Sequence, residues 1–471
     1  MFGKANEKDL RREPAPEIPE QVGDINDLEK YTTTEDAVFG AIVEGGPNYR
    51  ALGWIGTAVL MMKTQIGLGV LSIPVVFTSL GLIPGIICLL AIAIITTWSD
   101  YMIGTFKLKH PEVYGIDDVG SLIFGRIGRY VLSIAFILYW VFVAGSGMLG
   151  ISIAFNALSS HGTCTAVFVA IAAMLGFLLA SIRTLSKISW LAWIGLFCIL
   201  ASIFTLTVAV GVQDRPASAP RNGPWSSDWQ VTSSPTPATA MSGLATLVFA
   251  YAGTPAFFAI VSEMKAPKHY TRSLLVCQTV VTVTYLVIGI VVYYYCGTDV
   301  ATPALGSAGA LVKKICYGIA LPGLVVTTTI VVHIPAKYLF VKILRGSRHL
   351  NSNSPTHWGV WLGCTAGIAV VAYIIASAIP VFGDLVSLIG ALLGTLMSFQ
   401  PMGCMWLYDN WGREKSQRNL KWQLMVAFSV FVIVSGTFLM IAGTYGSVVA
   451  IMVSYNKSGG SAAWTCSDNS G

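Results

Sequence analysis

The first long apolar segment of the chain, residues 54–77, contains the stretch Lys63-Thr64-Gln65-Ile66-Gly67-Leu68-Gly69-Val70-Leu71-Ser72-Ile73-Pro74. Glycines in the middle of a helix weaken it. The segment 240–261 contains a second stretch of this kind, Phe249-Ala250-Tyr251-Ala252-Gly253-Thr254-Pro255. Its proline removes a helical hydrogen bond and clashes with the preceding turn. The sequence therefore predicts a broken helix at each of these two places.

The composition of the whole chain is that of an integral membrane protein. Of the 471 residues, 54% are hydrophobic and only 11% are charged, whereas roughly 25% are charged in ordinary soluble domains. A soluble protein of this size would expose far more charge. This composition excludes a soluble enzyme, a disordered protein and a nucleic-acid-binding protein. We also expect no cofactor and no bound metal, because the nine cysteines show no zinc-binding spacing.

A helix that crosses a bilayer needs about 20 apolar residues, and eleven such segments follow residue 50. Their approximate limits are 54–77, 80–106, 130–156, 164–182, 188–212, 240–261, 272–296, 311–336, 357–379, 383–407 and 421–453. We therefore predict an all-α transmembrane domain over residues 51–453. Residues 1–50 are interpreted as a polar cytoplasmic tail, and residues 454–471 as a tail on the opposite side.

The basic residues orient these spans. With a cytoplasmic N-terminus, 23 of the 29 Lys and Arg residues fall in the tail or the inner loops, and 5 fall outside. This bias is what the positive-inside rule requires. The C-terminus is then outside, where Asn456 begins the sequon Asn456-Lys457-Ser458 and is a potential glycosylation acceptor. The long outer loop 213–239 is interpreted as a solvated connector, with a lid over an outer vestibule as the alternative.

The two interrupted segments are the first and the sixth, so each one opens a set of five helices. Corresponding helices that are broken at corresponding depths are the best sequence indicator of an inverted-repeat transporter and of its site. The first repeat would cover residues 54–212 and the second residues 240–407, with an eleventh helix at 421–453. Close helix packing by small residues is the alternative explanation of the glycines.

Broken helices expose backbone groups that can bind a zwitterion. N–H groups at the start of a half-helix favour an anion, whereas carbonyls at the end of one favour an ammonium. The residues expected to face a carboxylate are Ile66, Gly67, Leu68 and Gly69. The carbonyls expected to face an amine are those of Phe249, Ala250 and Tyr251, and the small residues Ala252 and Gly253 leave room for a side chain.

These motifs also resemble a known family. The segments Gly67-Leu68-Gly69-Val70-Leu71-Ser72-Ile73-Pro74, Phe249-Ala250-Tyr251-Ala252-Gly253 and Glu263-Met264-Lys265-Ala266-Pro267 are similar to those of the amino acid/auxin permease family, over about residues 36–453. The upstream segment Gly46-Pro47-Asn48-Tyr49-Arg50 resembles fungal neutral amino acid permeases of the methyltryptophan-resistance type. The resemblance implies a LeuT-like fold of five plus five inverted helices, amino acid symport by alternating access, and a plasma-membrane location, with the vacuolar membrane as the alternative.

The expected substrates are neutral amino acids, both aliphatic and aromatic. No acidic residue lies in either break or in the middle of the third or eighth span, so a cationic side chain would lack a counter-charge. The alternatives are a broader specificity, or a nutrient receptor of the same fold that does not transport. A nucleotide-driven pump is excluded because no phosphate-binding loop is present.

Lys63 is the only Lys or Arg residue that lies deep inside a predicted span, since the others within the span limits are at span ends. It lies nine residues past Trp54, or ~14 Å along a helix, which a lysine stem of roughly 6 Å does not bridge to water. A charge within the membrane is a functional candidate by default. The resemblance implies proton coupling, because proton-coupled relatives carry lysine where sodium-coupled ones carry an amide. Thr327 and Thr328 of the eighth span are its expected contacts. A permanent structural charge and sodium coupling are the alternatives.

Three further features complete the set of candidates. Tyr139, in the third span, is a candidate donor to the substrate carboxylate or else a packing residue. Glu263 is a candidate inner gate or else an interfacial carboxylate paired with a loop cation. Cys164 and Cys296 both fall near the outer face, so a disulfide between them is considered.

Overall fold

The computed structural model describes residues 52–183, 185–220, 222–347, 349–350, 353–379, 381–412, 418–457, 464 and 466–470. Within this part of the chain the regular structure is helical, apart from one isolated β-bridge between Leu52 and Met264. The predicted cytoplasmic tail, residues 1–50, lies outside the described residues.

The first five spans are a broken helix followed by four continuous ones. In chain order they are α2 (Trp54–Gln65) with η1 (Gly69–Ser72) and α3 (Ile73–Leu80), α4 (Leu82–Lys109), α5 (Ile116–Ser159), α6 (Thr165–Ala180) and α7 (Leu185–Val212). The next five again begin with a broken helix, made of α8 (Pro237–Tyr251) and α9 (Thr254–Ser262). It is followed by α10 (Tyr270–Cys296), α11 (Ala310–Leu344), α12 (Pro355–Ala378) and a tenth span that begins with α13 (Phe382–Ile389). The last is α16 (Leu420–Lys457).

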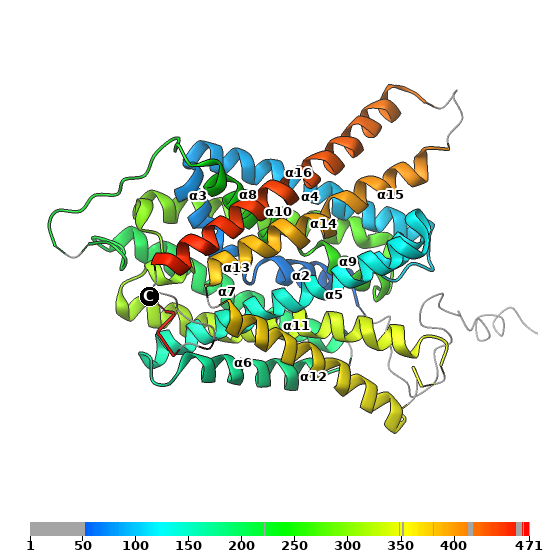
Figure 1. Cartoon of the computed structure of the whole chain (residues 1–471), viewed down its shortest axis with the longest axis horizontal. Coiled ribbons are helices and arrows are strands. Elements are labelled where there is room, and N and C mark those ends of the chain that lie inside the picture. Colours follow the sequence, from blue (N-terminus) through cyan, green and yellow to red (C-terminus); the bar gives the residue numbers. More distant parts are fainter. Residues whose placement is uncertain are drawn as a thin grey trace, which may run out of the picture.

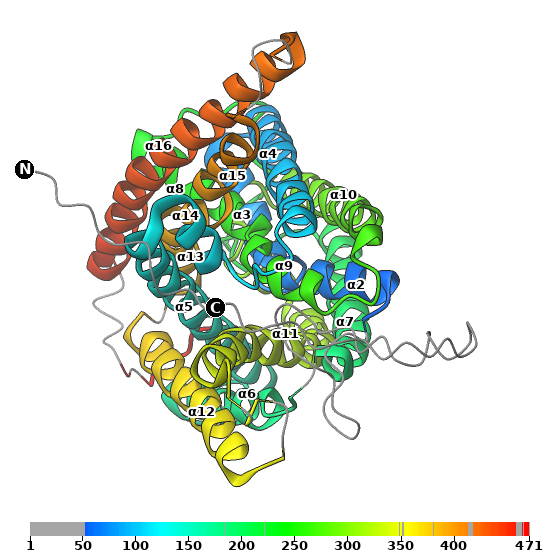
Figure 2. The ribbon, with the colours of Figure 1, turned by 90° about the vertical axis from the view of Figure 1, so that its right-hand side faces the viewer.

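Ten of these spans in the described residues are long and apolar enough to cross a membrane, and α6 is a shorter apolar helix. This confirms the predicted all-α membrane fold, including both broken helices. In each broken span, 89% of the apolar 18-residue stretch is buried inside the bundle, against 17% in α16. The broken spans therefore lie in the interior. In the end-on view of Figure 2, α12 and α16 lie at the rim of the bundle. Their exposed apolar side chains are suited to contact with lipid.

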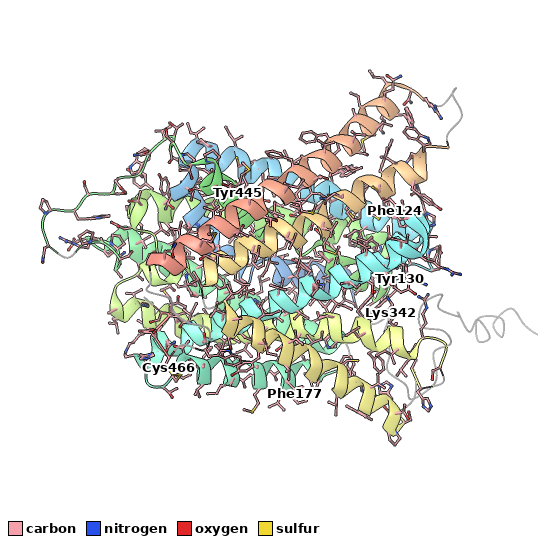
Figure 3. All side chains as sticks on the ribbon, in the orientation of Figure 1. Phe124, Tyr130, Phe177, Lys342, Tyr445 and Cys466 are labelled. Atoms are coloured by element: carbon pink, nitrogen blue, oxygen red, sulfur yellow. A yellow bond between two sulfur atoms is a disulfide. The ribbon has the colours of Figure 1, made fainter. Side chains whose placement is uncertain are left out.

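The charged connections gather at one end of the bundle. The connections α4–α5, α11–α12 and α15 (Gln400–Asn410)–α16 share this end in Figure 1. Lys342 lies there in Figure 3, whereas Cys466 lies at the opposite end. This basic end is the one predicted to be cytoplasmic. The helix α5 extends further into it than the predicted span, with a break at Gly125, whose φ is +67°, a conformation that glycine adopts without steric cost.

The tenth span is interrupted, although the sequence analysis predicted one helix at 383–407. After α13 come a π-helical turn, η5 (Gly390–Gly394), and then α14 (Thr395–Ser398), which ends before the irregular backbone at Phe399. Gly390 packs directly on α8, since a Cβ atom built on it would lie 2.0 Å from the carbonyl oxygen of Ala245. This close approach depends on a long-range contact, and it therefore left no periodic signal in the sequence.

The long outer loop is attached along its length. The amides of Leu82 and Ile83 at the start of α4 donate to the carbonyls of Gln230 and Val231, each at 3.0 Å. Asp228 accepts from the amide of Thr298 at 2.7 Å and from its hydroxyl at 2.6 Å. Partial burial opposes ionisation of Asp228, but these hydrogen bonds prevail and lower its pKa. These contacts favour the interpretation of the loop as a connector.

The disulfide considered between Cys164 and Cys296 is wrong. Cys164 is bonded to Cys466, and Cys296 is a free, buried thiol at the end of α10. The C-terminal segment returns over the outer ends of α5 and α6, where Asn469 accepts a hydrogen bond from Asn156 at 2.7 Å. Cys466 lies 302 residues along the chain from Cys164, so this disulfide depends on the C-terminal segment folding back over α6.

Candidate functional site

The first break begins where α2 ends at Gln65. Ile66 has φ −76° and ψ +74° and leaves the helix, and helical geometry resumes at Gly69. The first N–H groups of a helical segment have no acceptor within it, so η1 presents Gly69 and Val70 as donors. The amides of Ile66 and Gly67 already donate to the carbonyls of Met62 and Gln65, at 2.6 and 2.9 Å. The expectation that these residues face a carboxylate stays a prediction.

The second break lies between α8 and α9. Ala252 leaves the helix with ψ +42°, and Pro255 in the first turn of α9 has no amide hydrogen to satisfy. The carbonyls of Phe249 and Tyr251 accept local bonds from the amides of Ala252, at 3.0 Å, and Gly253, at 2.8 Å. Of the carbonyls expected to face an amine, these two therefore already have one partner each.

The two breaks touch each other through their glycines. A Cβ atom on Gly69 would lie 2.5 Å from the Cα atom of Ala250, and one on Gly253 would lie 2.5 Å from Oγ1 of Thr64. These are distances that real Cβ atoms do not show, so the absence of a side chain is what lets the backbones meet. The glycines therefore allow close packing of the helices and also lie at the breaks. The two explanations considered for them, helix breaking and close helix packing, are compatible.

Tyr285 on α10 joins the two breaks, and the sequence analysis missed it. Its hydroxyl lies 2.9 Å from the carbonyl oxygen of Gln65, which ends α2, and 2.8 Å from that of Ala250, near the end of α8. The side chain is fully buried and packs edge-on against the ring of Tyr251. The single hydroxyl hydrogen of Tyr285 is shared between, or alternates between, the carbonyls that end the two half-helices.

Lys63 is fully buried and connects the first break to α11. Its Nζ donates to Oγ1 of Thr327 at 2.5 Å and to the carbonyl oxygen of Ile66 at 3.2 Å. Thr327 also donates to the carbonyl of Gly323, one turn earlier in α11, at 2.9 Å. The expected contact with Thr327 is present, so the lysine ties the first break to the eighth span.

Thr328 points elsewhere. Its hydroxyl donates to the carbonyl of Leu324 at 2.9 Å, and a Cβ atom on Gly147 of α5 would lie 2.6 Å from that hydroxyl. The structure therefore places Thr328 at the α5–α11 contact, and no hydrogen bond joins it to Lys63 in the described residues.

Tyr139 reaches the second break from α5. Its buried hydroxyl donates to the carbonyl oxygen of Ala252, the residue at which α8 has ended. The side chain thus lies against the unwound segment, and its expected role as a donor to the substrate carboxylate stays a prediction. Its partner in this structure is a backbone carbonyl.

Gln65 is a second residue that the sequence analysis did not single out. Its side chain is 1% exposed, and neither its amide nitrogen nor its amide oxygen has a hydrogen-bond partner among the described residues. Its Cγ atom would lie 3.0 Å from a Cβ atom on Gly253, so the amide stem is beside both breaks. A buried amide with unsatisfied donors and acceptors is costly and is available to a bound polar ligand.

Glu263 lies after the end of α9, on the side of the breaks that faces the basic end. It forms a buried ion pair with Lys337 of α11, so its cation comes from a span and not from the neighbouring loop lysines. The amide of Leu52 donates to the carbonyl of Glu263 at 3.1 Å, and the amide of Lys265 donates to that of Leu52 at 2.9 Å. The start of the first span is therefore attached to the end of α9.

A polar pocket of about 260 Å³ lies on the other side of the breaks. It is lined by α3, α8 and α13, with hydroxyl groups from Ser72, Ser242 and Thr246 and the carboxyl group of Asp384. The oxygen of Ser72 and Oδ2 of Asp384 have no partner among the described residues. The pocket provides a polar space between the outer half-helices.

Comparisons with known proteins agree with this geometry. The family model of transmembrane amino acid transporter proteins matches residues 50–449. A transmembrane transporter of Gibberella moniliformis is 34% identical over 95% of this chain and 93% of its own length. The N amino acid transport system protein of Neurospora crassa is 32% identical over 90% of each chain.

Among solved structures, a Na⁺-coupled sialic acid symporter in a substrate-bound, outward-open state aligns with a TM-score of 0.54. It covers 90% of this chain and 94% of its own, at 15% sequence identity. The crystal structure of MhsT in complex with L-phenylalanine aligns with a TM-score of 0.51 over 85% of this chain and 98% of its own, at 13% identity. These alignments confirm the LeuT-like fold.

Proposed function

Because the chain belongs to the transmembrane amino acid transporter family, we propose that it imports neutral amino acids together with protons by alternating access. The observation that carries this proposal is the pair of touching breaks, with Lys63 attached to one side of them. A zwitterion would place its carboxylate at the free N–H groups of η1 and its ammonium near the carbonyl groups that follow Phe249.

The surroundings of the breaks favour an uncharged substrate side chain. Next to them lie small or apolar groups such as Leu68, Ala252 and Gly253, together with the neutral amide of Gln65. A lysine or arginine side chain would find no carboxylate among these residues, and desolvating it without a partner is costly. Lys63 is held by Thr327 and the Ile66 carbonyl, so it is not offered to an acidic side chain.

Coupling is assigned to Lys63. Its ammonium connects the first break to α11, as a bound cation would, and loss of its proton weakens both hydrogen bonds. Opening towards the basic end then requires breaking this connection and the Glu263–Lys337 ion pair. We assign Glu263 to an inner gate for this reason, with Tyr139 and the unwound residues as the substrate contacts.

We place the protein in the plasma membrane, with a cytoplasmic N-terminus and an outside C-terminus. The Cys164–Cys466 disulfide at the end opposite the basic connections supports an oxidising outer compartment. Asn456, exposed near the end of α16, would be on the side where glycosylation occurs. Fluorescent tagging separates the plasma membrane from the vacuolar membrane.

Uptake by the purified full-length chain in proteoliposomes tests the function and the substrate class. We expect radiolabelled leucine and phenylalanine to enter, and unlabelled neutral amino acids to compete with them at similar concentrations. A tenfold weaker competition by arginine and glutamate corresponds to about 1.4 kcal/mol of discrimination. Binding without entry would instead identify a receptor. Arginine or glutamate outcompeting leucine would contradict the proposed substrate class.

A further inference from the structure

Asp100 carries a fully buried carboxyl group in the second half of the spanning helix α4, nine residues before its end at Lys109, and the account above does not use it. Its Oδ2 accepts from the amide nitrogen of Gln278 on α10 at 2.6 Å, and its Oδ1 has no partner among the described residues. The hydroxyl of Thr254, the first residue of α9, lies beside the carboxyl group. The carboxyl group therefore sits where α4, α9 and α10 meet.

The other buried acids of the described chain differ from Asp100 in having a cation. Asp117 pairs with Lys342 at 3.2 Å, Asp118 pairs with Arg129 at 2.9 Å, and Glu263 pairs with Lys337. Asp100 forms no ion pair within the described residues. A buried carboxylate without a counter-charge is strongly disfavoured, and acids in this position in membrane proteins are functional candidates by default.

The ionisable groups around Asp100 leave a proton as its charge partner. The phenol of Tyr270 and the thiol of Cys277, both on α10, act electrostatically on the carboxyl group, and Tyr270 donates to the Asp100 backbone carbonyl at 2.9 Å. Neither α3 nor α9 carries an ionisable side chain. The ionisable side chains of the other neighbouring elements are Tyr251 on α8, Cys404, Tyr408 and Asp409 on α15, and Lys268 and His269 on η2 (Pro267–His269).

Several of these more distant groups are engaged with other partners. The hydroxyl of Tyr251 donates to that of Thr282 at 3.1 Å, and Asp409 is paired with Lys109 at 2.9 Å at the basic end. Lys268 on η2 and Arg272 on α10 are exposed at the surface. Among the described residues, no ion pair joins Asp100 to a cation, since Oδ2 is bonded to Gln278 and Oδ1 has no partner.

The position of Asp100 links it to the second break. Thr254 follows Gly253, and a Cβ atom on Gly253 would lie 2.5 Å from Oγ1 of Thr64, the residue after Lys63. A run of neighbouring residues thus leads from Asp100 through Thr254 and Gly253 to Thr64, which follows Lys63 in the chain. Any movement of α9 away from α4 removes Thr254 from the carboxyl group and exposes it to water.

From this arrangement we infer that Asp100 is a second proton-binding site of the transport cycle. The inference rests on the proposed function and deepens its coupling mechanism. A proton from water binds to Oδ1 while α9 is packed on α4, and the same O–H bond breaks, returning the proton to water, when α9 moves away. In this cycle the proton on Lys63 stabilises the first break. The proton on Asp100 depends on the position of α9, the half-helix that follows the second break.

The test uses proteoliposomes containing the full-length chain, with L-phenylalanine as substrate. A gradient of one pH unit multiplies the accumulation about tenfold for each proton that is coupled to the substrate. Asp100→Asn removes one proton-binding site and should lower the accumulation by about tenfold or more per pH unit, whereas counterflow exchange at equal pH remains. Asp228→Asn, the same change in the outer loop, should accumulate phenylalanine as the wild type does.

Gln278→Leu provides an independent readout that does not require Asp100→Asn to fold. It removes the donor that stabilises the carboxylate, so the pH of half-maximal uptake should rise by about one unit. An unchanged pH profile in Gln278→Leu, or full accumulation by Asp100→Asn, would overturn the inference while leaving the proposed function intact. A wild type that takes up no neutral amino acid would overturn the proposed function, and this inference with it.

Discussion

Lys63 is held by two neutral oxygen atoms in a position with no exposed surface. Each hydrogen bond from a charged group contributes about 1.5–3 kcal/mol, which offsets only part of the cost of burying the ammonium. The balance between the charged and the neutral lysine is therefore close, which suits a group that gains and loses a proton. At this scale, the first break and α11 are coupled through a single side chain.

Tyr285 allows a test at the residue scale. Tyr285→Phe keeps the ring but removes the hydroxyl that serves the Gln65 and Ala250 carbonyls. The Gln65 carbonyl keeps the amide of Gly67 as a donor, at 2.9 Å, so the loss falls mainly on the Ala250 carbonyl. A buried acceptor without a donor costs about 1–3 kcal/mol, and we therefore expect a lower thermal unfolding midpoint in detergent and slower phenylalanine uptake. Tyr295→Phe, a half-exposed tyrosine ten residues along the same helix, is the control. Equal midpoints for the two variants would show that the bridge is not stabilising.

The helical elements owe their interruptions to contacts between them. Gly69 meets Ala250 across the two breaks, and Gly390 meets Ala245 where the tenth span unwinds. In both cases the nearest atoms belong to backbone, which cannot move aside as a flexible side chain does. The segments around Gly69 and Gly390 are therefore packed tightly against α8. A substrate that binds at the breaks must enter between segments that are already in contact.

Gly69→Ala tests this packing at the scale of the elements. The new Cβ atom would lie 2.5 Å from the Cα atom of Ala250, and overpacking of this kind costs about 1–3 kcal/mol. We expect a lower unfolding midpoint together with loss of uptake. Gly359→Ala in α12, where a Cβ atom meets nothing within 4 Å, should be neutral or stabilising by about 0.5–1 kcal/mol. Wild-type uptake by Gly69→Ala would mean that the breaks do not need to touch.

The sequence predicted where the helices and their two breaks lie, but it did not predict which distant residues contact one another. The breaks at Gly67–Gly69 and Gly253–Pro255 follow from glycine and proline within apolar runs, and the lysine at residue 63 follows from its charge. Tyr285, Gln65 and Asp100 look like ordinary residues of a span until the fold brings distant helices against them. The interruption of the tenth span at Gly390 likewise depends on a contact with α8.

The whole molecule combines two broken helices at its centre with a loop and a tail that are fixed to the ends of the helices around them. The long loop is attached to α4 and α10, and the tail is attached to α6 by the disulfide at Cys164. The basic end holds the Glu263–Lys337 pair and the strand-like contact of Leu52. Because the start of the first span is bonded to the end of α9, we expect both inner half-helices to move as one unit during opening.

The most direct test of proton coupling through Lys63 is phenylalanine accumulation in sodium-free proteoliposomes that are acidic outside and alkaline inside. We expect the wild type to concentrate phenylalanine by about tenfold or more per pH unit and to lose this accumulation on addition of a protonophore. Lys63→Ala should exchange phenylalanine but not concentrate it, and Lys314→Ala, an exposed lysine on the outer side, should behave as the wild type. Strict sodium dependence at constant pH, or proton-driven accumulation that survives Lys63→Ala, would contradict the account.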